Sequence, residues 1–408
     1  MEAQVKPTQR VLLGITGGIA AYKSAELVRL LVKSGREVTA AMTAAAREFV
    51  GPATFQALSG RPVTADFFDN VHEVPHVRIG QQADLVVVAP ATANLLAKSS
   101  YGLADDLLTN TLLTAHCPVV MFPAMHTEMW EHAATRANVA TLRDRGVLVV
   151  DPDSGRLTGA DSGPGRLPEP EAIAWIVQAA LAKHDLRQDM RGRHVVVSGG
   201  GTRERLDPVR HIGNRSSGKQ GMALAAAAVS RGARVTLIRG DVDVPTPAGV
   251  EVVDALTADE MLACARDLAS AADVIIMAAA IADFRAETLP DAKIKKTDRS
   301  TLDLNLVHNP DVLATLVAER QGKSPLLVGF AAETGDDSGT WLEHAEQKFA
   351  KKGCDIMVAN PVGHERAFGT DTNEAVLLLG GGVTEEIPGT SKVELSHKVL
   401  DAVVDRLL

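Results

Sequence analysis

Residues 11–20, VLLGITGGIA, decide the fold of the first half of the chain. Val11–Ile15 is a short apolar run, Gly17-Gly18 interrupts it, and Ala20–Lys33 carries apolar residues at helical spacing. Glu37–Met42 is the next strand-like run. A strand, a glycine turn, a helix and a second strand in this order predict a βαβ unit with parallel strands.

Three later segments extend this unit. Ala83–Pro90 (ADLVVVAP) is apolar on both faces, which is typical of a strand buried in a parallel sheet beneath helices. Pro118–Phe122 and Val147–Val150 predict two further strands. Residues 154–170 contain four Gly and three Pro among polar residues, and therefore predict a long mobile loop.

The same pattern restarts at residue 194. His194–Gly201 (HVVVSGGG) is again a strand followed by glycines, Gly218–Arg231 predicts a helix, and Arg234–Ile238 predicts a strand. Ala272–Ala280 (ADVIIMAAA) is similar to Ala83–Pro90 in composition and in its place within the unit. We therefore expect an α/β protein with two doubly wound, Rossmann-like domains whose sheets are mainly parallel.

The join between these domains is expected near residue 190. The charged run Lys183–Arg193 has the composition of a linker, so the predicted domains span residues 1–190 and 191–408. Doubly wound folds bind ligands at the carboxyl ends of their strands, and we expect a site there in each domain.

Composition narrows the range of functions. The 408 residues are 46% hydrophobic, with a net charge of −9, and an acidic chain is poorly suited to nucleic acid or anionic membranes. The uncharged run Val274–Ala282 is far shorter than the ~20 residues that span a bilayer. Three cysteines suit a reducing compartment better than a disulfide framework. We expect a cytoplasmic protein that acts on small molecules.

Two motifs of the first half have both a functional and a structural interpretation. The turn Thr16-Gly17-Gly18 departs from the G-x-G-x-x-G of dinucleotide folds. It can hold one phosphate on backbone amides and the Thr16 hydroxyl, or simply form a tight turn. The small residues of Pro90–Asn94 leave room for a planar ring, but Thr92 or Asn94 can equally cap the next helix.

The second half carries two similar ambiguities. Gly213–Gln220 (GNRSSGKQ) contains the G-x-x-x-x-G-K of a P-loop, but Gln220 replaces the Ser or Thr that holds Mg²⁺. A helix start so rich in donors still suits an anion. The basic cluster Lys293–Lys296 is either a solvated face or, with Asp283, part of a nucleotide site. Asp283 itself can hold a base, a ribose or a metal ion.

Taken in order, the motifs of both halves resemble those of a bifunctional coenzyme A biosynthesis family. In this family phosphopantothenoylcysteine decarboxylase is fused to phosphopantothenate–cysteine ligase, and the resemblance covers nearly the whole chain. It rests on residues 16–23, 42–43, 76, 89–94, 104–108, 123–130 and 163–166 in the first half, and on residues 199–207, 210–221, 278–283, 293–296, 309–311, 329–334 and 368–373 in the second.

The resemblance implies FMN and a flavin-dependent decarboxylation in the first domain. In such proteins the flavin oxidises the cysteinyl thiol to a thioaldehyde-like electron sink and carbon dioxide leaves. The reduced flavin then converts the resulting enethiolate to 4′-phosphopantetheine. The implied cofactor-binding residues are Thr16, Gly17, Gly18, Ile19, Ala20, Thr43, Pro90, Ala91, Thr92 and Asn94.

Three positions bear on proton transfer in that domain. His76 matches the family's active-site histidine. His126 stands where the family has an Asn that contacts the substrate carboxylate, and an imidazole can donate a hydrogen bond from a similar place. Gly159 stands where well-known members carry a cysteine proton donor. Asp161, His126 or water would then supply the final proton, or the reduction proceeds differently.

The second domain is expected to use CTP. The carboxylate of 4′-phosphopantothenate attacks the α-phosphate, and the cysteine amine then displaces CMP from the acyl-cytidylate. The resemblance places Asn214 and Arg210 at the acyl intermediate and the substrate phosphate, and Mg²⁺ (or Mn²⁺) beside the triphosphate, with Asp283 as its ligand. The implied nucleotide-binding residues are Met277, Ala278, Ala279, Asp283, Lys293, Pro310, Asp311, Val312, Leu313, Phe330, Lys348 and Lys352.

Two rival functions are compatible with parts of this pattern. An FMN-binding regulatory or interaction subunit would keep the flavin but show no decarboxylase turnover. A two-domain NAD(P) oxidoreductase is disfavoured, because neither glycine turn is G-x-G-x-x-G. The resemblance also implies homo-oligomers, with trimers of the first domain, often within dodecamers, and dimers of the ligase domain.

Overall fold

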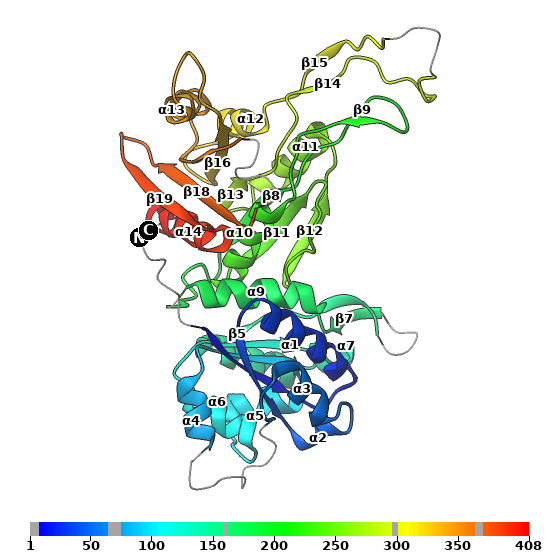
Figure 1. Cartoon of the computed structure of the whole chain (residues 1–408), viewed down its shortest axis with the longest axis vertical. Helices are drawn as coiled ribbons and strands as arrows, with labels where there is room; N and C mark the ends of the chain where they lie inside the picture. The colour runs from blue at the N-terminus through cyan, green and yellow to red at the C-terminus, as the bar shows by residue number, and fades with distance from the viewer. Residues whose placement is uncertain are drawn as a thin grey trace. The chain divides into compact units, whose positions relative to one another are not determined.

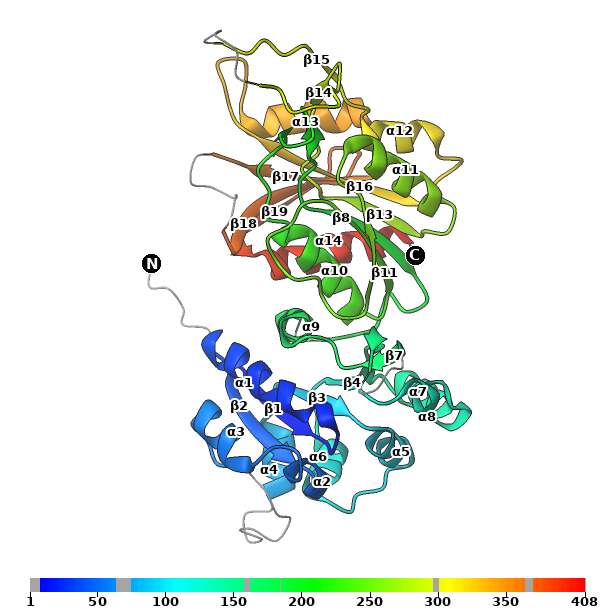
Figure 2. The same cartoon turned by 90° about the vertical axis from the view of Figure 1, so that its right-hand side faces the viewer.

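The computed structural model describes residues 8–63, 75–157, 162–183, 185–295, 301–363 and 370–407. It divides into two compact units, drawn in Figure 1 and Figure 2. One comprises Met1–Gln188 with Pro247–Gly249, and the other comprises Asp189–Thr246 with Val250–Leu408. Within the described ranges, no helix is both long enough and apolar enough to cross a membrane.

The first unit is built on a five-stranded parallel sheet. Its strands lie in the order β2 (Glu37–Met42), β1 (Arg10–Ile15), β3 (Leu85–Ala91), β4 (Val119–Pro123) and β5 (Leu148–Val149). Every residue of β3 is buried, which explains a sequence that is apolar on both faces. The order 2-1-3-4-5 is doubly wound, with its switch point between β1 and β3.

Helices cover both faces of this sheet. α5, α6 and α8 pack on one face around Leu12, Val86 and Val88, while α1 packs with α3 and α9 on the other (Figure 2). The predicted helix 20–33 begins as a 3₁₀ turn, η1, and continues as α1. The helices are η1 (Ile19–Tyr22), α1 (Lys23–Lys33), α2 (Ala44–Arg47), α3 (Pro52–Ser59), α4 (Pro75–Gln82), α5 (Ala93–Tyr101), α6 (Leu107–Thr114), α7 (Thr127–Glu131), α8 (Ala133–Asp144) and α9 (Pro170–Ala182).

The Gly- and Pro-rich segment 154–170 is not the long loop that its composition predicts. β6 (Asp153–Arg156) and β7 (Ser162–Arg166) form an antiparallel pair. Gly165, at φ 145°, lies so close to the main chain of Met125 that a Cβ would stand 2.1 Å from the Met125 carbonyl oxygen. The carbonyl of Gly165 also accepts the N–H of Met125 (2.9 Å). The prediction was wrong because these glycines permit close backbone packing rather than mobility.

The second unit contains an eight-stranded sheet in the order β12-β11-β8-β13-β16-β17-β18-β19. The first six strands are parallel and the last two antiparallel. Counted along the chain, the parallel strands have the 3-2-1-4-5-6 order of dinucleotide-binding folds, so the predicted α/β, mainly parallel, Rossmann-like class is confirmed. The strands are β8 (His194–Gly199), β11 (Arg234–Arg239), β12 (Val250–Asp254), β13 (Val274–Met277), β16 (Leu326–Glu333), β17 (Ile356–Pro361), β18 (Thr372–Leu378) and β19 (Thr384–Ser391).

Helices also cover both faces of the second sheet (Figure 2). α10 and α14 pack against each other on one face, and α11, α12 and α13 lie on the other, around Val196, Ile275 and Leu327. The predicted helix 218–231 is α10, and its N-cap Gly218 has φ 76°. The helices are α10 (Lys219–Ser230), α11 (Ala258–Ala269), α12 (Val312–Glu319), α13 (Trp341–Lys352) and α14 (Lys392–Leu407).

An arm extends from the second unit (Figure 1). It consists of two antiparallel strand pairs, β9 (Glu204–Arg205) with β10 (His211–Ile212) and β14 (Phe284–Ala286) with β15 (Leu306–His308). The base of the arm is fixed by the buried carboxylate of Asp207, which accepts hydrogen bonds from the N–H groups of Val209, Arg210 and Ile294. Burial alone would raise the pKa of Asp207, but these hydrogen bonds and the charge of Arg210 outweigh it and lower the pKa.

Candidate functional site

At the carboxyl edge of the first sheet, the turn after β1 is bonded to the end of β3. The Thr16 hydroxyl donates to the carbonyl of Pro90 (2.7 Å) and accepts the N–H of Thr92 (3.1 Å). Thr16 is only 2% exposed, so water cannot easily replace either bond. Thr92 is also the N-cap of α5, since its hydroxyl accepts the N–H of Leu95 (3.4 Å). Three of the predicted residues therefore meet at the β1/β3 switch point.

Glycines let the neighbouring turns approach this point. A Cβ on Gly17 would lie 2.4 Å from the Cβ of Ala45, so the turn after β1 packs directly on the start of α2. Thr43 caps that helix, with its hydroxyl accepting the N–H of Ala46 (3.3 Å). A Cβ on Gly18 would have only the Thr92 Cγ2, at 3.9 Å, within contact distance. The space above Gly18 is therefore open, whereas Gly17 is closely packed.

The remaining predicted cofactor residues lie on the same edge. Ile19 and Ala20 begin η1, and the Ile19 side chain is 62% exposed. Pro90 and Ala91 end β3 and are buried. Asn94 is exposed in the first turn of α5. This edge combines an apolar exposed side chain with polar groups from β1, β2 and β3.

The two predicted histidines lie on other elements of the first unit. His76 is half-buried in the first turn of α4, and its carbonyl accepts the hydroxyl of Thr114 (2.9 Å). His126 is exposed and is the N-cap residue of α7, directly after β4. Gly159 and Asp161, which bear on the final proton transfer, lie outside the described residues.

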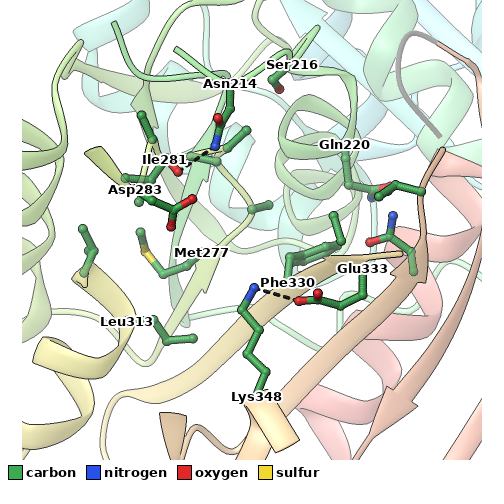
Figure 3. Close-up of a pocket in the computed structure, with 18 of the residues that line it drawn as sticks. Asn214, Ser216, Gln220, Met277, Ile281, Asp283, Leu313, Phe330, Glu333 and Lys348 are labelled. Atoms are coloured by element: carbon green, nitrogen blue, oxygen red, sulfur yellow. Dashed lines mark hydrogen bonds and ion pairs between the residues drawn. The ribbon is translucent and has the colours of Figure 1, made fainter. Parts of the chain in front are cut away.

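The second unit contains a cavity of about 1230 Å³ at the carboxyl edge of its sheet. It is formed by the ends of β13, β16 and β17 and by residues of α10, α12 and α13 (Figure 3). All the predicted nucleotide-binding residues except Lys293 line it, namely Met277, Ala278, Ala279, Asp283, Pro310, Asp311, Val312, Leu313, Phe330, Lys348 and Lys352. These residues are scattered over the second half of the sequence, and the fold brings them together around one cavity.

Asn214 and Asp283 both line this cavity (Figure 3). The Asn214 amide donates to the carbonyl of Ile281 (2.9 Å), which ties the segment before α10 to the loop after β13. Asn309 supports the same loop by donating its side-chain amide to the Ala282 carbonyl (2.7 Å) and its N–H to the Asp283 carbonyl (2.9 Å). The exposed Asp283 carboxylate is thus presented by a fixed backbone.

Arg210 and Lys293 lie at the base of the arm instead. The Arg210 guanidinium donates to the carbonyl of Ile294 (2.8 Å). Lys293, which precedes Ile294 in the chain, is exposed. Neither residue lines the cavity. The structure therefore groups Lys293 with Arg210 rather than with the other predicted nucleotide residues.

At one end of the cavity, positive and negative side chains balance. Lys348 of α13 donates to Glu333 at the end of β16 (2.9 Å), and Lys352 donates to Asp311, which also caps α12 through the N–H of Ala314. The charged residues of this end are Lys348, Lys351 and Lys352 against Asp311, Glu333 and Asp336. Hydrogen bonds from Ser338 lower the pKa of Asp336 to about 2.

At the other end, around the start of α10, positive charge is in excess. Arg215, Lys219 and Lys392 line the cavity there, and Lys219 donates to Asp371 (2.6 Å). Lys392 is 7% exposed and donates to the carbonyl of Thr372 (3.2 Å). Its burial lowers the pKa of its ammonium, and nearby Lys219 lowers it further.

Sequence reasoning missed several cavity residues. Lys219 belongs to the incomplete P-loop pattern, which follows the arm strand β10 rather than a strand of the main sheet. Asn360 is 7% exposed, and its side-chain amide has no hydrogen-bond partner among the described residues. A polar residue in the apolar run Ile356–Pro361 is a signal that could have found it. Lys392 follows the last strand, and no local pattern points to it.

The described residues include no group of three or more His, Cys, Asp or Glu side chains that could hold a metal ion. Asp283 therefore belongs to no preformed cluster of this kind in the described part of the chain. Mg²⁺ is commonly bound by one or two carboxylates together with the phosphates of a nucleotide, and Asp283 fits that arrangement.

Two family models match the chain: Flavoprotein over residues 2–182, and DNA/pantothenate metabolism flavoprotein C-terminal domain over residues 190–407. The chain is 53% identical over 402 residues to the coenzyme A biosynthesis bifunctional protein CoaBC of Mycobacterium tuberculosis (strain ATCC 25618 / H37Rv), across 97% of this chain and 96% of that protein.

Two further proteins are similar. CoaBC of Escherichia coli (strain K12) is 41% identical over 403 residues, across 98% of this chain and 97% of that protein. A crystal structure of the C-terminal domain of CoaBC is 31% identical and covers 54% of this chain and 98% of that one, with a TM-score of 0.45. The resemblance inferred from the motifs is confirmed by the full-length relatives, and this chain belongs to the family of CoaBC, the bifunctional proteins of coenzyme A biosynthesis.

Proposed function

We propose that this chain catalyses two successive reactions. Its second half joins 4′-phosphopantothenate to cysteine at the expense of CTP, and its first half decarboxylates the resulting phosphopantothenoylcysteine to 4′-phosphopantetheine. The observation that carries the proposal is the cavity of the second unit, which collects nearly all the predicted nucleotide residues. We assign the decarboxylase to residues 1–190 and the ligase to residues 191–408.

The ligase reaction needs positioning and charge neutralisation more than covalent chemistry. The substrate carboxylate attacks the α-phosphorus of CTP, the α–β anhydride bond breaks, and pyrophosphate leaves. The cysteine amine then attacks the acyl carbon, CMP leaves with the bonding electron pair, and the amine loses a proton. The Asn214 amide, fixed at Ile281, would orient the acyl group. Arg210 would hold the substrate phosphate from the base of the arm.

The charge distribution supports one orientation of the nucleotide. A triphosphate is best neutralised at the α10 end, where Arg215, Lys219 and Lys392 outnumber Asp371 and the helix start adds backbone N–H groups. The α13 end has no such excess. Phe330, the one Phe, Tyr or Trp among the described lining residues, lies toward that end and offers a stacking surface for the base.

Asp283 would hold the divalent ion, Mg²⁺ or Mn²⁺, together with the triphosphate. The ion would neutralise charge that develops on the departing pyrophosphate. Because Asp283 belongs to no group of three or more possible ligands in the described chain, metal affinity should depend on the nucleotide being bound.

The edge of the first sheet fits FMN. Its 2-1-3-4-5 strand order is one in which a flavin binds at the β1/β3 switch point. The open space above Gly18 and the exposed Ile19 suit a phosphate-bearing planar ring, while Thr16 fixes the ends of β1 and β3 to each other. When bound, the flavin supplies a reversible two-electron acceptor for the cysteinyl thiol of the substrate. Thr43, Thr92 and Asn94 would provide its polar contacts.

The two histidines would act on the substrate of the decarboxylase. We assign His76 to proton movement at the reacting cysteinyl group. We assign His126 to the substrate carboxylate, because an imidazole N–H can replace the amide donor of the family's Asn. Both side chains are accessible, since His76 is half-buried and His126 is exposed.

We propose a homo-oligomer in the cytoplasm, a dodecamer built from trimers of the first domain and dimers of the second. The three free cysteines suit a reducing compartment. The exposed apolar side chains Tyr22, Phe49, Leu103 and Met129 of the first unit are suitable for burial between subunits.

The proposal is tested with purified full-length protein reconstituted with FMN. A flavin absorption spectrum is expected, together with pyrophosphate release that requires CTP, 4′-phosphopantothenate and cysteine at once. A yellow protein that releases pyrophosphate but leaves phosphopantothenoylcysteine unchanged would instead indicate a regulatory first domain. A colourless protein without CTP-dependent pyrophosphate release would contradict both halves of the proposal.

A further inference from the structure

We propose that Glu333 and Lys348 recognise the Watson–Crick edge of the nucleotide base and select cytosine over uracil. The inference rests on the proposed function, because it concerns the base of the nucleotide that the ligase consumes. It adds Glu333, which lies in the resemblance segment 329–334 but was given no role, and it gives Lys348 a specific task.

The two side chains come from different elements and meet at the cavity surface. Glu333 is the last residue of β16 and Lys348 lies in the third turn of α13, with Nζ 2.9 Å from Oε1 (Figure 3). Both line the cavity, and their side chains are 22% and 39% exposed. Phe330 lies beside them on β16. A base stacked on Phe330 would therefore present its polar edge to an adjacent carboxylate and ammonium.

This pair is complementary to cytosine. Cytosine carries a donor, the N4 amino group, next to an acceptor, N3. The carboxylate of Glu333 can accept a hydrogen bond from N4 while the ammonium of Lys348 donates to N3. Uracil has the reverse pattern, since O4 is an acceptor and N3 carries a proton. The same pair would thus face uracil with two unfavourable contacts, which is how a site rejects a close analogue.

The second ion pair of this end does not have the same capacity. Asp311 already accepts the N–H of Ala314 as the cap of α12, in addition to pairing with Lys352. Among the described residues, the Glu333 carboxylate bonds only to Lys348, through Oε1. Its Oε2 can therefore accept the N4 amino group without any helix losing its cap.

The test is the ratio of CTP use to UTP use in Glu333→Gln. Glutamine keeps the shape of the side chain but adds an N–H donor that can serve uracil O4. The full-length FMN-loaded protein is assayed for pyrophosphate release, and CTP and UTP binding are compared by calorimetry. The CTP:UTP ratio of kcat/KM is expected to fall by about 10- to 100-fold, the range of one paired base contact.

Glu346→Gln is the matched control. It removes the same charge as Glu333→Gln, from the helix that carries Lys348, but Glu346 is exposed and does not line the cavity. Its CTP:UTP ratio should equal that of the wild type. Should Glu333→Gln fail to fold, Lys348→Met tests the other half of the pair and should weaken CTP binding more than UTP binding.

The outcomes separate this inference from the proposed function. A wild type that prefers CTP, with an unchanged ratio in Glu333→Gln, would overturn the inference and leave the ligase assignment standing. A wild type that releases no pyrophosphate with CTP would overturn the ligase assignment, and the calorimetric comparison would still decide the base preference. Equal binding of CTP and UTP by the wild type would also overturn the inference.

Discussion

The carboxyl edges of the two sheets are held in different ways. In the first unit, neutral groups hold the edge together: the Thr16 hydroxyl joins two strands and Gly17 packs against Ala45. In the second, charged side chains line the site, and Lys348 and Lys352 are paired with carboxylates. A neutral, backbone-built edge is complete before its ligand arrives. A charged edge must exchange partners when a ligand binds, and it can therefore discriminate between ligands.

The largest expected effect concerns a charge inside the second unit. Arg231 is 1% exposed and bonds to Asp189 (2.6 Å), Asp401 (2.8 Å) and the His397 carbonyl (3.2 Å). Arg231→Met leaves two carboxylates without this cation; because their side chains are 26% and 44% exposed, we expect a loss of ~3 kcal/mol in the second unit, the lower end for breaking a buried ion pair. In a thermal unfolding experiment, the second unit of the variant should unfold at a lower temperature than in the wild type. The first unit should release its flavin, followed by absorbance, at the same temperature in both proteins.

Arg266→Met is the control for that experiment. Its partner is Glu319, and both side chains are about half exposed (47% and 48%). The loss should stay below ~1 kcal/mol, as for most surface pairs. Equal destabilisation by the two substitutions would remove the contrast between buried and exposed charge.

A second substitution attacks the neutral edge. In Gly17→Ala the new Cβ would lie 2.4 Å from the Ala45 Cβ, so the turns after β1 and β2 must separate. We expect an overpacking cost of ~1–3 kcal/mol in the first unit and loss of bound flavin, with ligase activity retained. Flavin content is read from absorbance. Gly51→Ala is the control, because a Cβ there meets nothing within 4 Å, and this variant should bind flavin normally. Equal loss of flavin from both variants would show that the contact between Gly17 and Ala45 is not the cause.

A smaller effect is expected from Thr16→Val. It leaves the partly buried Thr92 N–H and the buried Pro90 carbonyl without their partner, at a cost of about 1–2 kcal/mol in the first unit. Thr16→Ser keeps the hydroxyl and should restore most of the stability. Chemical denaturation followed by flavin fluorescence measures both. If valine and serine behave alike, the hydroxyl does not hold the two strands together.

The smallest effect is a pH dependence in the arm. Because the folded pKa of Asp207 is lowered, its contribution to stability is full above the ordinary Asp value of about 4 and is lost as the pH falls through the lower folded value. Between pH 7 and pH 3 the wild-type second unit should lose more stability than Asp207→Asn, whose amide oxygen can still accept the N–H groups of Val209 and Arg210 and does not titrate. Parallel losses in the two proteins would assign the acid sensitivity to other carboxylates.

Local patterns predicted the βαβ units well: the strands at 11–15, 83–90 and 194–199 appear with nearly the same bounds, while the run 272–280 forms a strand only over Val274–Met277. Apolar periodicity and glycine turns are local signals, and burial of both faces of β3 follows from its composition. The pair β6–β7 was missed because Gly and Pro can serve a tightly packed ladder as well as a loop.

Only part of the candidate site could be predicted from the sequence. The strand order brings Thr16 to Pro90, and the packing of α13 on β16 places Lys348 and Phe330 around one cavity; motif resemblance identified these residues. Partners that arise from long-range pairing carry no local signal: Lys219 meets Asp371 across the second unit, and Glu333 meets Lys348. Lys293 was grouped with the cavity, but the carboxylate of Asp207 and the guanidinium of Arg210 hold its neighbour Ile294 at the arm.

The most direct measurement follows the carboxyl carbon of cysteine. Full-length protein loaded with FMN is incubated with [1-¹³C]cysteine and 4′-phosphopantothenate, and labelled carbon dioxide is measured before and after CTP is added. Release only after CTP, with 4′-phosphopantetheine as the product by mass, is the predicted result, because ligation must precede decarboxylation. Labelled carbon dioxide without CTP, or none while phosphopantothenoylcysteine accumulates, would contradict it.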